Sequence, residues 1–300
     1  MSKRRSGFSK LSVIVISLIV AGLLSLSVNV YAQGKEKPLR FGVAAMISPK
    51  ETADVYQQIL YYVAEELGRD VKMVQRKSYD EMDELLKTKN VEIAFVCSGP
   101  YVADHDDFGV ELLVAAQVYG EAVYYSYIIV SADSALNGME GLRGKKFAFT
   151  DPKSNTGCLV PTYMLAKMNE TPDSYFSEYI YSGHHSQSIE KVANKEVDGA
   201  AVDHLIWEYM DATGSEFTPK TRILLKSPPF GIPPVVVHPG MDTQLKARIR
   251  EILLNMHTNE NGRRILKKVF IDKFIVPKDS SYDTIREMKK WIQTKNQEAE

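Results

Sequence analysis

Two successive runs of alternating apolar and amphipathic segments follow residue 38 and limit the folds open to this chain. In the first run, short apolar segments predict strands and amphipathic segments predict helices. The predicted strands span 39–46, 70–76 and 91–96, and the predicted helices span 51–68 and 79–89. Short strands that alternate with helices are typical of a parallel sheet with helices packed on its faces. The pattern therefore predicts an α/β fold.

The second run repeats this architecture. Its predicted strands span 145–150, 176–182 and 197–203, and its predicted helices span 158–168, 186–196 and 204–210. Extended segments at 110–120 and 122–132 precede this run, a proline-rich segment at 222–240 follows it, and helical patterns at 242–269 and 282–297 end the chain. About 260 residues are enough for two lobes of ordinary size. We predict one lobe from 38–119 with 234–300 and a second from 120–233, each a mixed sheet covered by helices, with a ligand cleft at the hinge.

The N-terminus has the three parts of a secretory signal peptide. The basic start "MSKRR" precedes the uncharged apolar run "LSVIVISLIVAGLLSLSV", and small residues at Val30 and Ala32 suit a cleavage site. This order predicts a signal peptide over 1–32 and an extracytoplasmic protein. Because the apolar run is nearly long enough to cross a membrane, an uncleaved anchor is the alternative.

The charge balance bears on nucleic-acid binding, and the cysteine content bears on disulfide formation. Without residues 1–32 the chain has 33 Lys and Arg against 38 Asp and Glu, a net charge of about −5 with His neutral. This balance gives no basic patch for nucleic acid. The two cysteines, Cys97 and Cys158, could form one disulfide, but a bridge between lobes would obstruct opening. We favour free, partly buried thiols.

The loop "DPKSNTGCLVP", residues 151–161, is the leading candidate for a binding site. It places Ser154, Asn155, Thr156 and Gly157 where a predicted strand turns into a helix N-terminus. Hydroxyls and free backbone N–H groups at the positive end of a helix favour an anion. The alternative is that these residues only cap the helix.

Other loops at the carboxyl ends of predicted strands support an anion site, because ligands of open α/β sheets bind at that edge. Ser98 and Tyr101 follow the strand at 91–96, His185 follows the strand at 176–182, and Asp203 ends the strand at 197–203. Each also has a structural interpretation. Asp203 can cap the next helix, Tyr101 can be a core residue, and His185 can be a polar residue at a helix start.

Four segments together resemble the phosphonate-binding proteins of ABC importers and their wider phosphate/phosphite/phosphonate-binding branch. They are "SGPYV", "DPKSNTGCLVP", "SGHHSQSIEKVANKEVDGAAVD" and "SPPFGIPPVVVHPG". The resemblance covers nearly all of the chain after the N-terminal segment. It implies a two-lobed type II periplasmic binding protein that delivers a small oxyanion to an ABC permease.

The resemblance also implies ligand-binding residues. Ser154, Asn155 and Thr156, beside Gly157, match the family's oxyanion loop, and His185 matches its cleft histidine. Ser98 and Tyr101 fall in the loop that faces the anion from the first lobe. Tyr56 lies near a position that is often aromatic in the family.

The acidic residues with which the family holds a ligand amine are not matched here. Leu205 and the turn around Pro233 occupy their positions, and Asp203 lies two residues before Leu205. A small phosphorus oxyanion without a cationic tail, such as phosphite, phosphate or methylphosphonate, therefore fits better than an aminoalkyl phosphonate.

No Lys or Arg cluster accompanies these loops, so helix dipoles and His185 are expected to supply the electrostatics. Asp203 is the candidate acceptor for a protonated anion.

Two alternatives remain, one a binding protein with a different partner and the other an enzyme. The same receptor could present its ligand to a membrane sensor kinase instead of a permease. An enzyme is less favoured, because no HExxH, CxxC or GxSxG motif occurs and nothing assembles a nucleophile with a base. We expect no cofactor, no metal, no nucleic-acid partner and a monomeric protein.

Overall fold

The computed structural model describes residues 37–46 and 49–299, and the side chains of 49–55, 296, 298 and 299 are not described. The chain divides into two units, Met1–Pro38 and Leu39–Glu300, and every helix and strand that the structure describes belongs to the second. The predicted signal peptide over 1–32 lies outside the described residues. In the described part of the chain, no helix has both the length and the hydrophobicity to cross a membrane.

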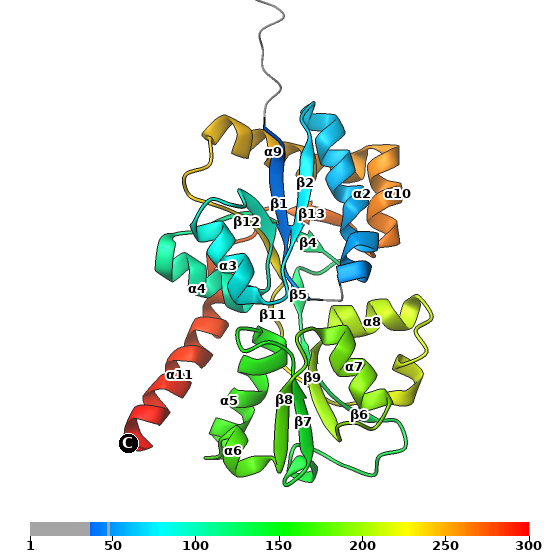
Figure 1. Cartoon of the computed structure of the whole chain (residues 1–300), viewed down its shortest axis with the longest axis vertical. Helices are drawn as coiled ribbons and strands as arrows, with labels where there is room; N and C mark the ends of the chain where they lie inside the picture. The colour runs from blue at the N-terminus through cyan, green and yellow to red at the C-terminus, as the bar shows by residue number, and fades with distance from the viewer. Residues whose placement is uncertain (1–36, 47–48, 300) are drawn as a thin grey trace, which may run out of the picture. The chain divides into compact units, whose positions relative to one another are not determined.

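A six-stranded mixed sheet contains the first three predicted strands (Figure 1). Its strand order is β13-β4-β12-β3-β1-β2. The strands are β1 (Leu39–Val43), β2 (Val71–Gln75), β3 (Ile93–Phe95), β4 (Glu111–Gln117), β12 (Pro234–Val237) and β13 (Lys273–Ile275). Strands β2, β1 and β3 run parallel, and β12 pairs antiparallel with β3 and β4. The carboxyl ends of β1 and β3 therefore lie at the same edge.

Helices cover both faces of this sheet. They are α2 (Pro49–Leu67), α3 (Tyr79–Lys87), α4 (Ser98–Phe108), α9 (Thr243–Asn255), α10 (Glu260–Lys268) and α11 (Asp283–Ala299). Ile93 and Phe95 of β3 pack in a core with α2, α9 and α10, whereas Ala94 packs on the other face with α3, α4 and α11. This division follows from the two-residue period of a strand.

A five-stranded sheet contains the strands of the second run. Its order is β10-β6-β9-β7-β8, in which β8, β7 and β9 are parallel and β6 is antiparallel to β9 and β10. The strands are β6 (Ser126–Ser131), β7 (Lys146–Phe149), β8 (Glu178–Tyr181), β9 (Gly199–Asp203) and β10 (Thr221–Lys226). Its helices are α5 (Val160–Lys167), α6 (Pro172–Tyr175), α7 (His185–Ala193) and α8 (His204–Ala212).

Short elements complete the chain. A two-stranded sheet pairs β5 (Val123–Tyr124) with β11 (Phe230–Gly231) beside the segments that pass between the larger sheets. A π-helix, η2 (Asn155–Leu159), precedes α5. The 3₁₀ helices are η1 (Glu140–Leu142), η3 (Thr218–Lys220), η4 (Met256–Thr258) and η5 (Asp279–Tyr282).

The predicted two-lobed α/β fold with mixed sheets is confirmed, and strand β13 and helix α4 are among the elements that were not predicted. Strand β13 is only three residues long and adds to an edge of its sheet. Helix α4 begins with "SGP", residues that are poor in a helix interior but acceptable in a first turn. The sequence therefore suggested a loop where a helix begins. The exact division of the chain into lobes stays a prediction.

Candidate oxyanion site

The loop after β7 forms a capped helix start, as its sequence predicted. Ser154 is the N-cap of η2, and its Oγ accepts a hydrogen bond from the Gly157 N–H at 3.0 Å. A Cβ on Gly157 would lie 1.7 Å from Thr150 Oγ1, so only glycine lets this turn approach the end of β7. Gly157 is therefore a packing residue whose N–H is already used. The N–H groups that precede it in the first turn have no partner within the helix.

A second helix N-terminus meets this loop. Helix α4 begins at Ser98, with Cys97 as its N-cap. A Cβ on Gly99 would lie 2.4 Å from Lys153 O and 3.1 Å from Asn155 N, so the two helix starts are in direct contact. The positive ends of two helix dipoles therefore converge near Cys97.

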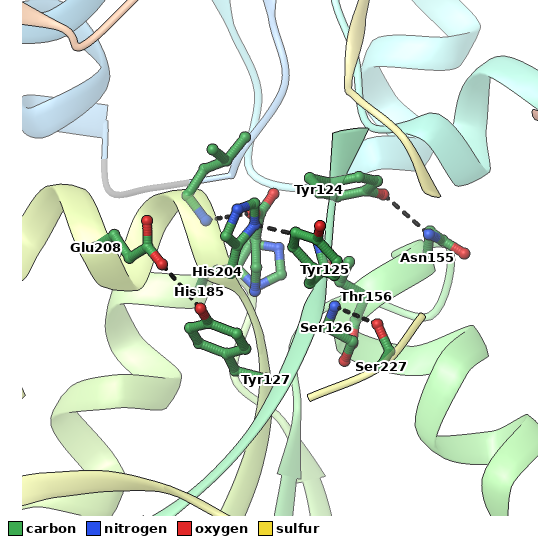
Figure 2. A network of polar contacts seen from close by, with 12 residues as sticks. Tyr124, Tyr125, Ser126, Tyr127, Asn155, Thr156, His185, His204, Glu208 and Ser227 are labelled. Carbon is green, nitrogen blue, oxygen red and sulfur yellow. Dashed lines mark hydrogen bonds and ion pairs between the residues drawn. The ribbon is translucent and has the colours of Figure 1, made fainter. Parts of the chain in front are cut away.

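Besides Thr150 Oγ1, against which Gly157 packs, three buried polar atoms around the two helix starts have no hydrogen-bond partner among the described residues. They are Tyr79 Oη, Asn155 Oδ1 and Thr156 Oγ1. Tyr79 packs with Cys97, and Asn155 Nδ2 lies 3.0 Å from the hydroxyl of Tyr124, which also contacts Cys97 Sγ (Figure 2). Buried polar atoms are nearly always paired in native proteins, so the unpaired atoms gathered around these two helix starts make this place a candidate ligand site.

A hydrogen bond from Ser126 holds the backbone of the Ser154–Gly157 loop in place. Ser126 Oγ donates to the carbonyl of Thr156 at 2.6 Å, and the Ser126 N–H donates to Ser227 Oγ at 2.9 Å (Figure 2). The first bond fixes the loop to strand β6, and the second fixes β6 to the segment after β10. Neither bond uses the hydroxyl of Thr156, which is buried.

His185 is the first residue of α7 and is 1% exposed. Its Nδ1 accepts a hydrogen bond from the Asp203 N–H at 3.0 Å, so the neutral ring carries its proton on Nε2. Burial lowers the pKa of His185 to about 4, despite the opposing charge of Asp203. The expected electrostatic contribution of His185 would therefore come from an uncharged N–H donor near neutral pH.

Asp203 has the capping role that was one of its two interpretations. Its Oδ1 accepts the Leu205 N–H at 2.8 Å and caps α8, and the residue also lines a cavity of about 110 Å³. Burial raises the pKa of Tyr79 and Tyr124, and the charges of Cys97 and Asp203 add to both shifts. Tyr56 lines the same cavity with its ring 4.8 Å from Phe95, and burial raises its pKa.

Contacts at this site join the two sheets. The His185 N–H donates to Met46 O at 3.0 Å, and the Tyr79 N–H donates to Asp151 Oδ2 at 3.2 Å. Lys153, the one cation of the loop, pairs with Asp80 at 2.5 Å and Asp83 at 2.8 Å. Its ammonium is thus held by carboxylates of α3, which leaves neutral dipoles to face an anion.

Of two predicted ligand residues in α4, one lies away from the site and the other has its hydroxyl proton engaged within the protein. Tyr101 packs against Tyr282, and its hydroxyl donates to Asp279 Oδ1 at 2.5 Å. It is one turn into α4, so its side chain turns away from the helix start. Ser98 lies at the site, but its hydroxyl donates to Gly231 O at 2.7 Å, so only its backbone remains.

Tyr79 and Tyr124 were missed by the sequence reasoning. Nothing distinguishes them among sixteen tyrosines, because their place depends on how the two sheets meet. Tyr79 does follow β2 at the carboxyl edge of the first sheet, and that position was the available signal.

The two cysteines are free and buried, as predicted. Burial raises the pKa of both thiols, so neither has the character of a reactive thiolate. Among the described residues, no group of three His, Cys, Asp or Glu side chains is arranged to hold a metal ion.

Comparisons with known proteins identify the family of this chain. The profile of the family described as "ABC transporter, phosphonate, periplasmic substrate-binding protein" matches residues 41–282. The phosphonates-binding periplasmic protein of Escherichia coli is 24% identical over 284 residues, which are 92% of this chain and 83% of that protein. The phosphate-import protein PhnD of Mycolicibacterium smegmatis is 28% identical over 177 residues, which are 54% of this chain and 55% of that protein.

Solved structures show the same fold. The binding component of a phosphonate ABC transporter from Pseudomonas aeruginosa superposes with a TM-score of 0.82 at 23% identity, over 87% of this chain and 88% of that one. PhnD1 from Prochlorococcus marinus, solved with methylphosphonate, gives 0.77 at 18% identity, over 86% and 98%. These relatives are substrate-binding proteins of transporters and not enzymes. The chain therefore belongs to the family of periplasmic substrate-binding proteins of phosphonate ABC transporters.

Proposed function

We propose that this protein captures a small phosphorus oxyanion, namely phosphite, phosphate or a simple phosphonate, and delivers it to an ABC permease. The head group would bind where the first turns of α4 and η2 meet. The observation that carries the proposal is the set of three unpaired buried atoms, Tyr79 Oη, Asn155 Oδ1 and Thr156 Oγ1, at these two helix starts.

Neutral donors would hold the anion. Thr156 and Tyr79 can each donate a hydroxyl hydrogen bond, and backbone N–H groups of a first turn can donate as well. Because the Tyr124 hydroxyl can donate or accept, a 180° rotation of the Asn155 amide keeps their contact and directs Nδ2 to the place of Oδ1. Hydrogen bonds from neutral donors to an ionised oxygen are short and strong.

Asp203 would favour an oxyanion that still carries a proton. Its side chain is 3% exposed, and its charge contributes to the raised pKa of Tyr79 and Tyr124. A fully ionised ligand would meet this negative charge, whereas a P–OH group can donate to it. The proposal therefore predicts weaker binding of sulfate, which carries no proton near neutral pH.

A panel of anions tests the proposal. The purified protein is freed of bound ligand by reversible unfolding and melted with phosphite, phosphate, methylphosphonate, sulfate, an alkanesulfonate or an amino acid. A ligand that binds only the folded state adds about 2.7 kcal/mol at 100 times its Kd, which gives a clear shift in Tm. A shift with phosphorus oxyanions alone supports the proposal, and a shift only with the sulfonate or the amino acid refutes it.

The proposal also covers export, oligomeric state and closure of the two lobes. We propose export by a cleavable signal peptide over 1–32, a monomeric mature protein, and hinge closure between a lobe of 38–119 with 234–300 and a lobe of 120–233. Mass spectrometry of the exported protein should give an N-terminus at Gln33. Recovery of the permease with the ligand-bound protein from cross-linked membranes would support delivery to a transporter.

A further inference from the structure

Cys97 is an uncommon N-cap for helix α4. Its backbone has the extended conformation of an N-cap, with φ −68° and ψ 155°, but its side chain makes no capping hydrogen bond. Serine, threonine, aspartate and asparagine are preferred at this position, because their side-chain oxygen accepts an N–H of the first turn. A thiol is a much weaker acceptor. Helix α4 therefore begins without the usual cap.

The first turn of α4 has few N–H groups that a cap could bond. The helix starts with Ser98, Gly99 and Pro100. The Tyr101 N–H already donates to the Cys97 carbonyl at 3.1 Å. An N-cap side chain bonds the second or third residue of its helix, and Pro100 has no N–H. A cap at position 97 could therefore use only the Gly99 N–H.

The Cys97 thiol lies where donors of two helix starts meet. Asn155 is the first residue of η2, and its N lies 3.1 Å from the position of a Cβ on Gly99. Neither N–H has a partner within its own helix. Burial raises the pKa of the Cys97 thiol, and the N–H groups of Gly99 and Asn155 oppose that shift because they favour a negative charge on the sulfur. The neutral thiol leaves this preference for an anion unsatisfied.

Polar side chains next to Cys97 are also left without a partner. Tyr79 is 1% exposed and packs with Cys97 in a buried cluster, and its hydroxyl has no hydrogen-bond partner among the described residues. Cys97 Sγ contacts Tyr124 Oη at 3.8 Å, and the same hydroxyl accepts a hydrogen bond from Asn155 Nδ2 at 3.0 Å (Figure 2). The other oxygen-bearing end of that amide, Asn155 Oδ1, is buried and unpaired. Open N–H groups and open side chains thus surround one thiol.

We propose that Cys97 is a positioning residue, which as a weak cap leaves the Gly99 N–H free in the unbound protein, so that this donor and the adjacent Asn155 N–H are available to an oxyanion. The inference rests on the proposed function and names the residue that keeps the same site open. A serine at this position would bond the Gly99 N–H, and an anion would have to displace that bond before it could bind.

Cys97→Ser and Cys97→Ala separate capping from packing. Both remove the sulfur, but only serine can cap α4. Calorimetric titration of the purified protein with methylphosphonate should give a Kd about fivefold higher for Cys97→Ser, because a cap of ordinary strength must be displaced. Cys97→Ala cannot cap and should keep the Kd within about twofold of its original value. An unchanged Kd in Cys97→Ser, or an equal rise in Cys97→Ala, would overturn the inference.

Cys158→Ser is the matched control for the loss of a thiol. Cys158 is the other buried free cysteine, and it packs in the core of the second sheet. The same substitution there should leave the Kd for methylphosphonate unchanged. An equal rise in Cys158→Ser and Cys97→Ser would assign the effect to the loss of a buried thiol and would contradict a capping role.

Backbone NMR measures the Gly99 donor directly. In the unsubstituted protein, the Gly99 amide proton should move downfield as methylphosphonate is added, because it gains a hydrogen bond to a charged oxygen. In unbound Cys97→Ser, the same proton should already lie downfield of its position in the unbound original. A Gly99 proton that stays in place when the unsubstituted protein is saturated would overturn the inference, even if neither variant folds.

Failure of the inference and failure of the proposed function give different results. If methylphosphonate binds with the same Kd in Cys97→Ser, the oxyanion site stands and the role of Cys97 is wrong. If no phosphorus compound binds the unsubstituted protein, the proposed function itself fails. The unbound spectra still test the cap in that case, since an identical Gly99 proton position in Cys97→Ser and the original would show that serine does not cap α4.

Discussion

Thr156→Val separates a ligand-binding hydroxyl from a structural one. The two side chains have nearly the same shape, so the substitution removes the hydroxyl and little else. Thr156 Oγ1 is buried and has no partner among the described residues. If it serves only the ligand, its removal should weaken binding without harm to the fold.

Thr156→Val should weaken ligand binding but should keep or raise the free energy of unfolding. A hydrogen bond to a charged group contributes about 1.5–3 kcal/mol, so the Kd for a phosphorus oxyanion should rise about 10- to 150-fold. A buried hydroxyl without a partner costs the fold about 1–3 kcal/mol of desolvation. The free energy of unfolding without ligand should therefore stay the same or increase by up to about that amount.

Calorimetric titration with methylphosphonate and urea unfolding without ligand measure the two effects. Thr218→Val is the matched control, because Thr218 Oγ1 is also buried without a partner but lies in η3, away from the site. We expect the control to leave the Kd unchanged. Loss of stability in Thr156→Val with an unchanged Kd would show that the hydroxyl is structural and would refute the reasoning.

Three further predictions concern the support of the site. Gly157→Ala should lower the free energy of unfolding by about 1–3 kcal/mol and reduce Tm, because its Cβ would overlap Thr150. The lowered pKa of His185 means that stability falls as pH drops from 6.5 towards 4, and His185→Gln should remove that dependence in urea unfolding across this range. Lys153→Met leaves the buried Asp83 without its cation and, since the Lys153 side chain is 36% exposed, should cost about 1–2 kcal/mol in the same assay. A Lys153→Met protein with unchanged stability would show that this ion pair does not hold the sheets together.

The oxyanion loop and the fold could be predicted because their signals are local. The alternation of strands and helices follows from hydrophobic periodicity, and the Ser154–Gly157 turn follows from capping chemistry. Parallel strands then bring distant loops to one edge of each sheet, which is why Ser98, His185 and Asp203 could be named from sequence position.

The parts that could not be predicted depend on contacts between distant segments. Tyr101 was assigned to the site from its place in a loop, but the loop is the first turn of α4 and the side chain packs beside Tyr282. The neutral state of His185 arises from burial against the Asp203 backbone, which no local pattern reveals. Tyr79 belongs to the site only because two sheets meet there.

A crystal structure of the purified protein grown with methylphosphonate tests the central claim most directly. The account predicts that the phosphonate oxygens lie within hydrogen-bond distance of Thr156 Oγ1 and Tyr79 Oη at the first turns of α4 and η2. A phosphonate bound elsewhere, with both hydroxyls still unpaired, would contradict the account.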